Sequence, residues 1–165
     1  MSQAVLDALK SKFGDAILSA DSKYQDESVT IAPGKLIEVC TFLRDDDKMA
    51  FDYPVFLTCT DHMGLPGETH RFEVVVQLRS VTKRHRIRVK VPLEEGKLKV
   101  PTLSGLWVGF NWLERETYDM YGVEFEGHPD MRRIYLYDEF EGFPLRKDFP
   151  KDRRFPLARR EWTDE

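Results

Sequence analysis

Two adjacent segments with alternating apolar residues restrict the fold of this chain more than any other feature of its sequence. From Phe72 to Leu78 every second residue is large and apolar, and over 84–91 apolar residues alternate with arginine and lysine. A period of two places apolar side chains on one face of a β-strand and polar ones on the other. Residues 80–83 suffice only for a tight connection, so the pattern predicts an antiparallel hairpin with a solvent-facing basic side.

Periodic patterns on both sides of this hairpin predict the other elements. Strands are expected as a pair within 16–32 and singly over 55–60, because both stretches are rich in β-branched and apolar residues. Apolar residues at helical spacing predict helices over 5–13, 36–43 and 104–121, the last with Ser104 as N-cap and Gly122 as stop signal. We therefore expect the α+β class, as an α/β two-layer fold with helices packed on one mixed, largely antiparallel sheet.

The segment after Gly122 follows neither period, yet it is unlike a disordered linker because it is rich in large apolar side chains. Among them are Phe140, Phe143, Phe149, Phe155 and Trp162. Such anchors in a non-periodic segment are typical of an arm that wraps around a partner protein; the alternative is that the segment folds back over its own sheet. We predict an α/β domain over 1–122 and an extended partner-wrapping C-terminal arm over 123–165.

The two cysteines, Cys40 and Cys59, are too few for a thiolate-ligated iron–sulfur cluster and are not spaced as a redox pair. We expect buried core thiols and a reducing compartment. The first residues lack the features of a signal or transit peptide, so the mature chain is expected to start there. The longest stretch without a charged residue or histidine, Val100 to Leu113, is shorter than a membrane-spanning helix needs.

The net charge of −4 conceals an uneven distribution. Residues 1–68 carry a net charge of −6, residues 69–99 carry +6 and residues 100–165 carry −4. The basic strand could follow a phosphate backbone, but the aromatic residues that stack on bases are missing from its basic face. A solvated face, or one complementary to an acidic protein partner, is the favoured interpretation, and a nucleic-acid-binding module the less favoured one.

Three carboxylates, Glu114, Glu116 and Asp119, lie close together on the predicted third helix. Glu116 and Asp119 share a face and, with His128, could serve a stand-alone enzyme. Arg115 and Asp119 are four residues apart, which suits an ordinary ion pair, so surface salt bridging is favoured. The histidines lack metal-binding spacing, and no phosphate-binding or serine-hydrolase motif occurs. From its motifs the chain is an interaction domain without chemistry of its own.

Two long motifs carry a family resemblance. The stretch Asn111-Trp112-Leu113-Glu114-Arg115-Glu116-Thr117-Tyr118-Asp119-Met120-Tyr121-Gly122-Val123, continued by His128-Pro129-Asp130-Met131-Arg132-Arg133-Ile134, closely resembles the signature of the C subunit of NADH-quinone oxidoreductase, the respiratory complex I family. The later Pro144-Leu145-Arg146-Lys147-Asp148-Phe149-Pro150 is similar to that family's second hallmark. The sequence departs from the pattern at Phe143, where His is common.

The resemblance implies a non-catalytic peripheral-arm subunit of a proton-translocating NADH:quinone oxidoreductase. FMN, iron–sulfur clusters and quinone would be bound by partner subunits and none by this chain. The arm would pack across the D subunit of complex I, the main partner, with the B subunit nearby. Attachment to the cytoplasmic side of the bacterial inner membrane would come only through the complex. A related membrane-bound hydrogenase-type complex is the closest competing assignment.

The resemblance also selects candidate site residues, all with interface rather than catalytic roles. We expect four residues of the third helix to orient that helix and its junction with the arm, namely Glu114, Arg115, Glu116 and Asp119. Three residues of the second motif are expected to make charge-assisted contacts to the partner, namely Arg146, Lys147 and Asp148. The remaining candidates are the motif residues Gly122, His128, Arg132 and Pro144.

Overall fold

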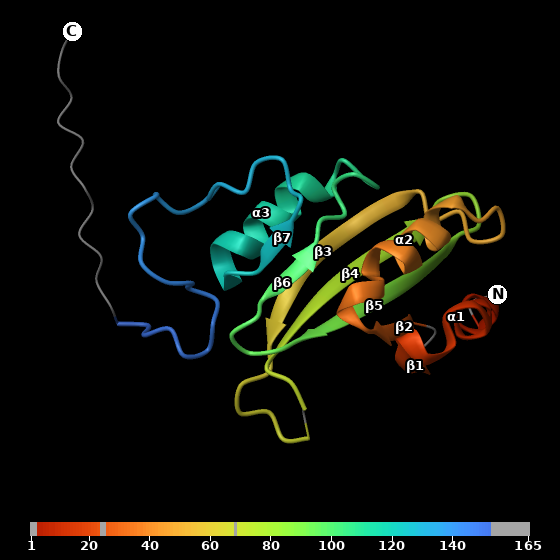
Figure 1. Cartoon of the computed structure of the whole chain (residues 1–165), viewed down its shortest axis with the longest axis horizontal. Helices are drawn as coiled ribbons and strands as arrows, with labels where there is room; N and C mark the ends of the chain where they lie inside the picture. The colour runs from red at the N-terminus through yellow and green to blue at the C-terminus, as the bar shows by residue number, and fades with distance from the viewer. Residues whose placement is uncertain (1–2, 24–25, 68, 153–165) are drawn as a thin grey trace, which may run out of the picture.

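The computed structural model describes residues 3–23, 26–67 and 69–152, and its elements follow the predicted order (Figure 1). The N-terminal half contains α1 (Gln3–Phe13), β1 (Ile17–Lys23), β2 (Asp26–Ile31) and α2 (Leu36–Asp45), with single 3₁₀ turns at Gly14–Ala16 and Pro33–Lys35. The second half contains β3 (Tyr53–Asp61), β4 (Phe72–Ser80), β5 (His85–Leu93), β6 (Lys99–Pro101), α3 (Phe110–Tyr121) and β7 (Glu124–Glu126).

Five strands form one sheet in the order β1-β2-β5-β4-β3. The predicted hairpin is β4 and β5, which pair antiparallel with Val76 opposite Val89. Val29 of β2 also lies opposite Val89, in the only parallel pairing of this sheet within the described chain. β6 and β7 form a separate two-stranded parallel sheet. The prediction of a mixed, largely antiparallel sheet is confirmed.

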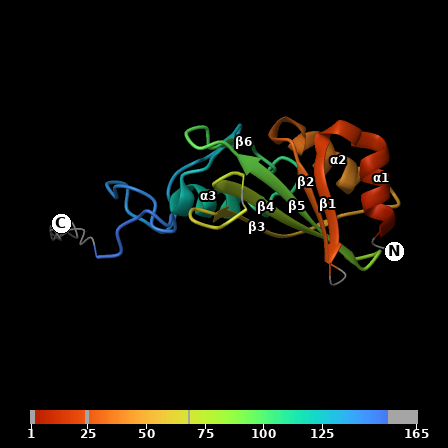
Figure 2. The same ribbon diagram turned by 90° about the horizontal axis from the view of Figure 1, so that it is seen from below.

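The core lies between the apolar face of this sheet and the helices. α1 and α2 lie on the same side of the sheet in Figure 2 and bury the apolar stripes that their periodicity predicted. The alternating positions of β4 and β5 face this core, and Cys40 and Cys59 are buried in it as free thiols. Burial raises the pKa of both thiols to about 12, so neither is a reactive thiolate at neutral pH.

The third helix begins at Phe110, so the predicted start at Ser104 is wrong. Apolar residues keep helical spacing across 103–109, but this stretch forms successive turns, in which Trp107 N–H donates to the Leu103 carbonyl. Gly105 and Gly109 lower the helix propensity of this stretch, and the Leu103 N–H at its start donates to the carboxylate of Glu114. The predicted stop is confirmed, because Gly122 ends α3 with a φ of 75°.

The chain from 127 to 152 contains no helix or strand and extends beyond α3, at the opposite end of the molecule from α1 (Figure 1). Residues 123–126, which the sequence placed with the arm, form β7 and its approach, with Val123 and Phe125 in the core. The division into a domain and an arm stays a prediction. Phe155 and Trp162 lie outside the described residues. No helix in the described ranges is long and apolar enough to cross a membrane.

Candidate functional site at α3 and the C-terminal segment

The residues of both motifs meet where the segment 127–152, here called the C-terminal segment, runs along α3 and returns to the end of the large sheet. It has no backbone ladder of its own, so its position depends on side chains that reach its main-chain groups. Four anchoring points on the folded body supply these contacts: Asp119, Arg115, the turn at Gly122, and the ends of β3 and β4.

Asp119 makes the densest of these contacts. Its carboxylate is fully buried, and its Oδ2 accepts the N–H groups of Ile134, Tyr135 and Leu136 at 3.2, 2.8 and 3.0 Å. Its Oδ1 lies 2.8 Å from Nη1 of Arg133, whose Nη2 donates to the carbonyls of Phe140 and Gly142. Burial by itself would raise the pKa of Asp119, but these hydrogen bonds and the guanidinium outweigh it and lower the pKa.

Arg115 fixes the preceding stretch of the segment. Its Nε donates to the Arg132 carbonyl at 3.0 Å, and its Nη1 lies 3.8 Å from Asp130. The Asp130 carboxylate pairs with the Arg132 side chain through two 2.7 Å contacts, which lower its pKa to about 2. The buried His128 imidazole accepts the Asp130 N–H at Nδ1 and contacts the Asn111 carbonyl through Nε2 at 3.1 Å. A proton on Nε2 satisfies both contacts.

The turn at Gly122 receives the second motif. A Cβ on Gly122 would lie 2.5 Å from the Phe143 ring and 2.6 Å from Nη2 of Arg146, so only glycine leaves room for both side chains. Arg146 Nε donates to the Tyr121 carbonyl at 2.7 Å, and its guanidinium lies over the rings of Phe143 and Phe72. Phe143 therefore contributes a ring to a cation–π contact with Arg146.

Pro144 is half-buried in the tight turn that places these side chains. The Arg146 N–H donates to the Phe143 carbonyl, which puts proline at the second position of the turn, where its fixed φ is favourable. The Leu145 N–H donates to the Met120 carbonyl at 3.2 Å and attaches the turn to α3.

An ion-pair cluster at the ends of β3 and β4 holds the last described part of the segment. Arg71 contacts Asp61 through two 3.2 Å hydrogen bonds and lies 2.8 Å from Asp148 and 2.5 Å from Glu95. Asp61 also accepts the Lys147 N–H at 2.9 Å. Burial would raise the pKa of Asp61, but the Arg71 guanidinium and the N–H groups of Lys147 and Met63 lower it overall. Lys147 and Asp148 thus contact the ends of β3 and β4.

Glu114 is buried on the other side of α3, so its predicted place in surface salt bridges is wrong. Its Oε1 accepts the Leu103 N–H at 2.6 Å and its Oε2 accepts the Thr102 hydroxyl, while Nε2 of His128 lies 3.9 Å away. Burial raises the pKa of this carboxyl to about 7, against the opposing effect of the hydrogen bonds from Thr102, Leu103 and Ser104. Glu114 therefore connects α3 to the chain that precedes it.

The predicted ion pair between Arg115 and Asp119 is also wrong, because each reaches the C-terminal segment instead. Glu116 and Asp119 do not form an acid–base pair, since both Asp119 oxygens are occupied by Arg133 and by main-chain N–H groups. Within the described ranges no three His, Cys, Asp or Glu side chains are placed to hold a metal ion.

Three site residues were not found from the sequence, namely Asp61, Arg71 and Arg133. Asp61 directly follows the predicted strand 55–60, and Arg71 directly precedes the predicted strand that begins at Phe72. Antiparallel pairing of those two strands would have brought Asp61 and Arg71 together. Arg133 lies in the motif, but its partner is 14 residues away and no local pattern indicates the contact.

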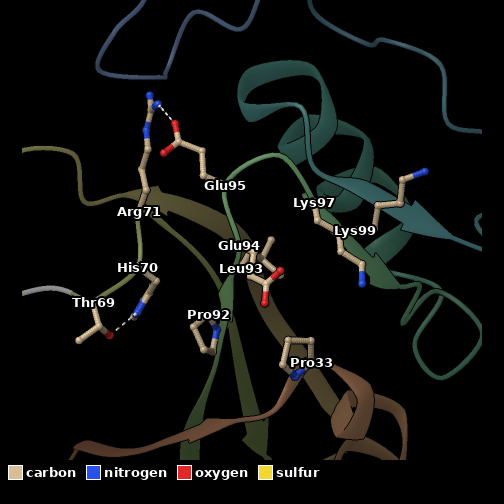
Figure 3. A pocket seen from close by; sticks show the side chains of 10 residues that line it. All are labelled: Pro33, Thr69, His70, Arg71, Pro92, Leu93, Glu94, Glu95, Lys97 and Lys99. Atoms are coloured by element: carbon tan, nitrogen blue, oxygen red, sulfur yellow. Dashed lines mark hydrogen bonds and ion pairs between the residues drawn. The ribbon is translucent and has the colours of Figure 1, made fainter.

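A cavity of about 550 Å³ opens beside this cluster, between the start of β4 and the connection from β5 to β6 (Figure 3). Arg71 and Glu95 face each other on one side of it, and Lys97 and Lys99 lie on another. Lys99 pairs with Glu124 at 2.6 Å. The charged groups are largely paired and do not converge on one point, so the cavity lacks the geometry of a nucleophile with its base.

Comparisons with known proteins agree with the motifs. Residues 29–155 match the family described as respiratory-chain NADH dehydrogenase, 30-kDa subunit. The chain is 42% identical over 157 residues to the C 2 subunit of NADH-quinone oxidoreductase from Rhizobium meliloti, covering 93% of this chain and 84% of that protein. It is 44% identical over 146 residues to the C subunit of the same enzyme from Roseiflexus sp., covering 88% and 82% of the two chains.

Solved structures resemble the fold. The trypsin-resistant fragment of Nqo5 superposes with a TM-score of 0.69 at 28% identity, covering 79% of this chain and 99% of the fragment. A chain of the membrane-bound sulfane sulfur reductase, an archaeal respiratory membrane complex, superposes with a TM-score of 0.73 at 21% identity, covering 90% and 85% of the two chains. At that identity the second likeness concerns the fold alone.

Proposed function

This chain belongs to the family of the 30-kDa subunit of respiratory-chain NADH dehydrogenase, the C subunit of complex I, and we propose that it acts there as a scaffold without a redox centre. Its C-terminal segment binds the subunits that hold the clusters and the quinone, with the D subunit as main partner and the B subunit nearby. Relatives named NADH-quinone oxidoreductase favour complex I over the hydrogenase-type assembly.

One observation carries the proposal. The C-terminal segment has no regular structure, yet buried charges hold its main chain in one path while some of its large side chains face outward. Tyr135 is 67% exposed and Leu145 is 52% exposed, although the segment around them is anchored to α3. Because the segment is already held in one conformation, it presents its apolar side chains to a partner and loses little conformational entropy when it binds. The arrangement suits docking better than catalysis.

The position of the chain in the cell follows from the same proposal. A scaffold that binds the cluster-bearing subunits would lie on the cytoplasmic side of the bacterial inner membrane and would reach that membrane only through the complex. FMN, iron–sulfur clusters and quinone would then belong to its partners. The buried, neutral thiols of Cys40 and Cys59 fit a chain without cluster ligands.

Arg146→Ala tests the proposal in the assembled complex. The substitution removes the hydrogen bond to the Tyr121 carbonyl and the cation over Phe143, so the segment loses its anchor at Gly122. We expect weaker assembly and lower quinone-linked NADH oxidation, while the isolated chain keeps its circular dichroism spectrum. Lys151→Ala, at an exposed position of the same segment, is the matched control and should behave as wild type. Normal assembly and activity of Arg146→Ala would overturn the proposal.

A further inference from the structure

A groove on the far face of the large sheet has no role in the function proposed above. It has a volume of about 740 Å³ and lies where the hairpin of β4 and β5 meets the starts of β2 and β3. This face of the sheet is opposite the one covered by α1 and α2 (Figure 2). The groove therefore lies away from the contacts that hold the C-terminal segment.

Five cations and two carboxylates line this groove, which leaves it strongly positive. Asp26 forms ion pairs with two of the cations, Arg86 at 3.1 Å and Arg88 at 2.7 Å. The other three, Arg79, Lys83 and Arg84, are exposed and make no ion pair within the described residues. Uncompensated like charges gathered at one end of a hairpin repel one another and are relieved by an anionic partner.

One side of the groove, along the edge strand β3, carries exposed apolar side chains, and these restrict the kind of partner. Tyr53 is 54% exposed and Val55 is 42% exposed on the edge strand β3, and Phe56 lies beside them. Tyr53 is the register partner of Arg79, so their side chains leave neighbouring strands on the same face of the sheet. Exposed aromatic side chains flanked by arginine are the composition of protein-binding hot spots.

The free cations are too few, and too interrupted, for a nucleic acid. A phosphate backbone needs cations in a continuous row, whereas the Asp26 carboxylate sits within this one, between Arg86 and Arg88. The Asp26 carboxylate is compatible with a protein partner, because the side chains of a protein can be placed so that they avoid it or donate to it.

We propose that this groove, formed by Tyr53, Val55, Phe56, Arg79, Lys83 and Arg84, docks an acidic segment of another subunit that carries an apolar anchor. The anchor contacts Tyr53, Val55 and Phe56, and the carboxylates of the segment pair with the three free cations. The complex therefore contacts this chain on two separate surfaces, the C-terminal segment and the groove. The inference rests on the proposed function, because it requires the chain to be part of the complex.

Photo-cross-linking in the purified complex tests the proposal. p-Benzoylphenylalanine replaces Tyr53, and peptide mass mapping locates the cross-linked product. We expect a cross-link to an acidic stretch of a neighbouring subunit, reduced at least fivefold when Arg79→Glu and Lys83→Glu are added. Arg84 is left unchanged because its backbone has a left-handed φ of 55°, and a substitution at such a position could alter the turn as well as the charge. Lys10→Glu with Lys48→Glu, an equal change at exposed positions elsewhere, should leave the cross-link intact.

Several outcomes would overturn the inference: no protein cross-link, a product with lipid or nucleic acid, or a cross-link that the Arg79→Glu and Lys83→Glu pair leaves unchanged. The thermal transition of each isolated full-length variant establishes that it folds. Failure of this inference is distinct from failure of the proposed function. A labelled chain that still assembles but gives no cross-link refutes the groove alone, whereas a wild-type chain that does not assemble refutes the scaffold.

Discussion

Replacing Glu114 by Gln should remove most of the pH dependence of this protein's stability between about pH 4.5 and 7. The carboxyl is fully buried, and burial raises its pKa from an ordinary 4.5 to about 7. In that range the unfolded chain releases the proton while the folded chain keeps it. The wild-type free energy of unfolding is therefore highest at low pH within this window and falls as the pH rises through 7.

The size of the effect follows from the pKa. A tenfold change in proton affinity corresponds to about 1.4 kcal/mol, so a rise from 4.5 to about 7 makes up to about 3 kcal/mol of stability depend on pH. Gln has the shape of protonated Glu, can still accept the Leu103 N–H and can donate to the Thr102 hydroxyl. Glu114→Gln should thus fold and show a flat profile.

Urea unfolding followed by tryptophan fluorescence, at intervals from pH 4.5 to 8, measures this difference. The matched control is Glu116→Gln, which removes a half-buried carboxyl from the same helix and should keep the wild-type slope. Asp61 and Asp119 do not obscure the result. Their pKa values are lowered, so the stability they contribute is lost only as the pH falls below about 3.8. Equal slopes for wild type and Glu114→Gln would refute the assignment of the proton to Glu114.

Three further substitutions test the anchoring of the C-terminal segment. Asp119→Asn removes the charge that faces Arg133 and leaves buried N–H donors without their full acceptor. The free energy of unfolding measured in urea should therefore fall by about 2–3 kcal/mol. A change below about 0.5 kcal/mol would contradict these contacts. Gly122→Ala places a methyl group against Phe143 and Arg146 at a left-handed φ, so trypsin should cut the segment faster than in wild type, with Gly105→Ala, in open space, as control. Arg71→Met should similarly free the end of the segment, seen as faster amide exchange at Lys147, and unchanged exchange there would argue against the ion-pair cluster.

The periodic part of the fold was predictable because each element carries its own signal. The alternation in β4 and β5 fixed their core faces, and the helical spacing in α1 and α2 fixed the stripes they bury. The start of α3 was not predictable in this way. Residues 103–109 have helical spacing too, but Gly105 and Gly109 lower the helix propensity there, and the chain forms separate turns such as the one closed by the Leu106 N–H and the Leu103 carbonyl.

The candidate site was likewise predictable only in part. The motifs identified the right stretch of chain, but the partners of its charged residues lie in a segment without regular structure. Local spacing favoured an ion pair between Arg115 and Asp119, four residues apart, and tertiary structure replaced it with contacts to 130–136. A buried carboxylate that binds three consecutive N–H groups leaves no periodic trace in the sequence. Only the three-dimensional arrangement brings such groups together.

The central claim, that the C-terminal segment is the surface by which this subunit binds its neighbours, is most directly tested by amide hydrogen exchange. The exchange of residues 137–150 is compared between the isolated full chain and the assembled complex, with the exposed β1 strand, Ile17–Lys23, as internal reference. The account predicts at least tenfold slower exchange of the segment in the complex and little change in β1. Equal exchange of the segment in the two states would contradict it.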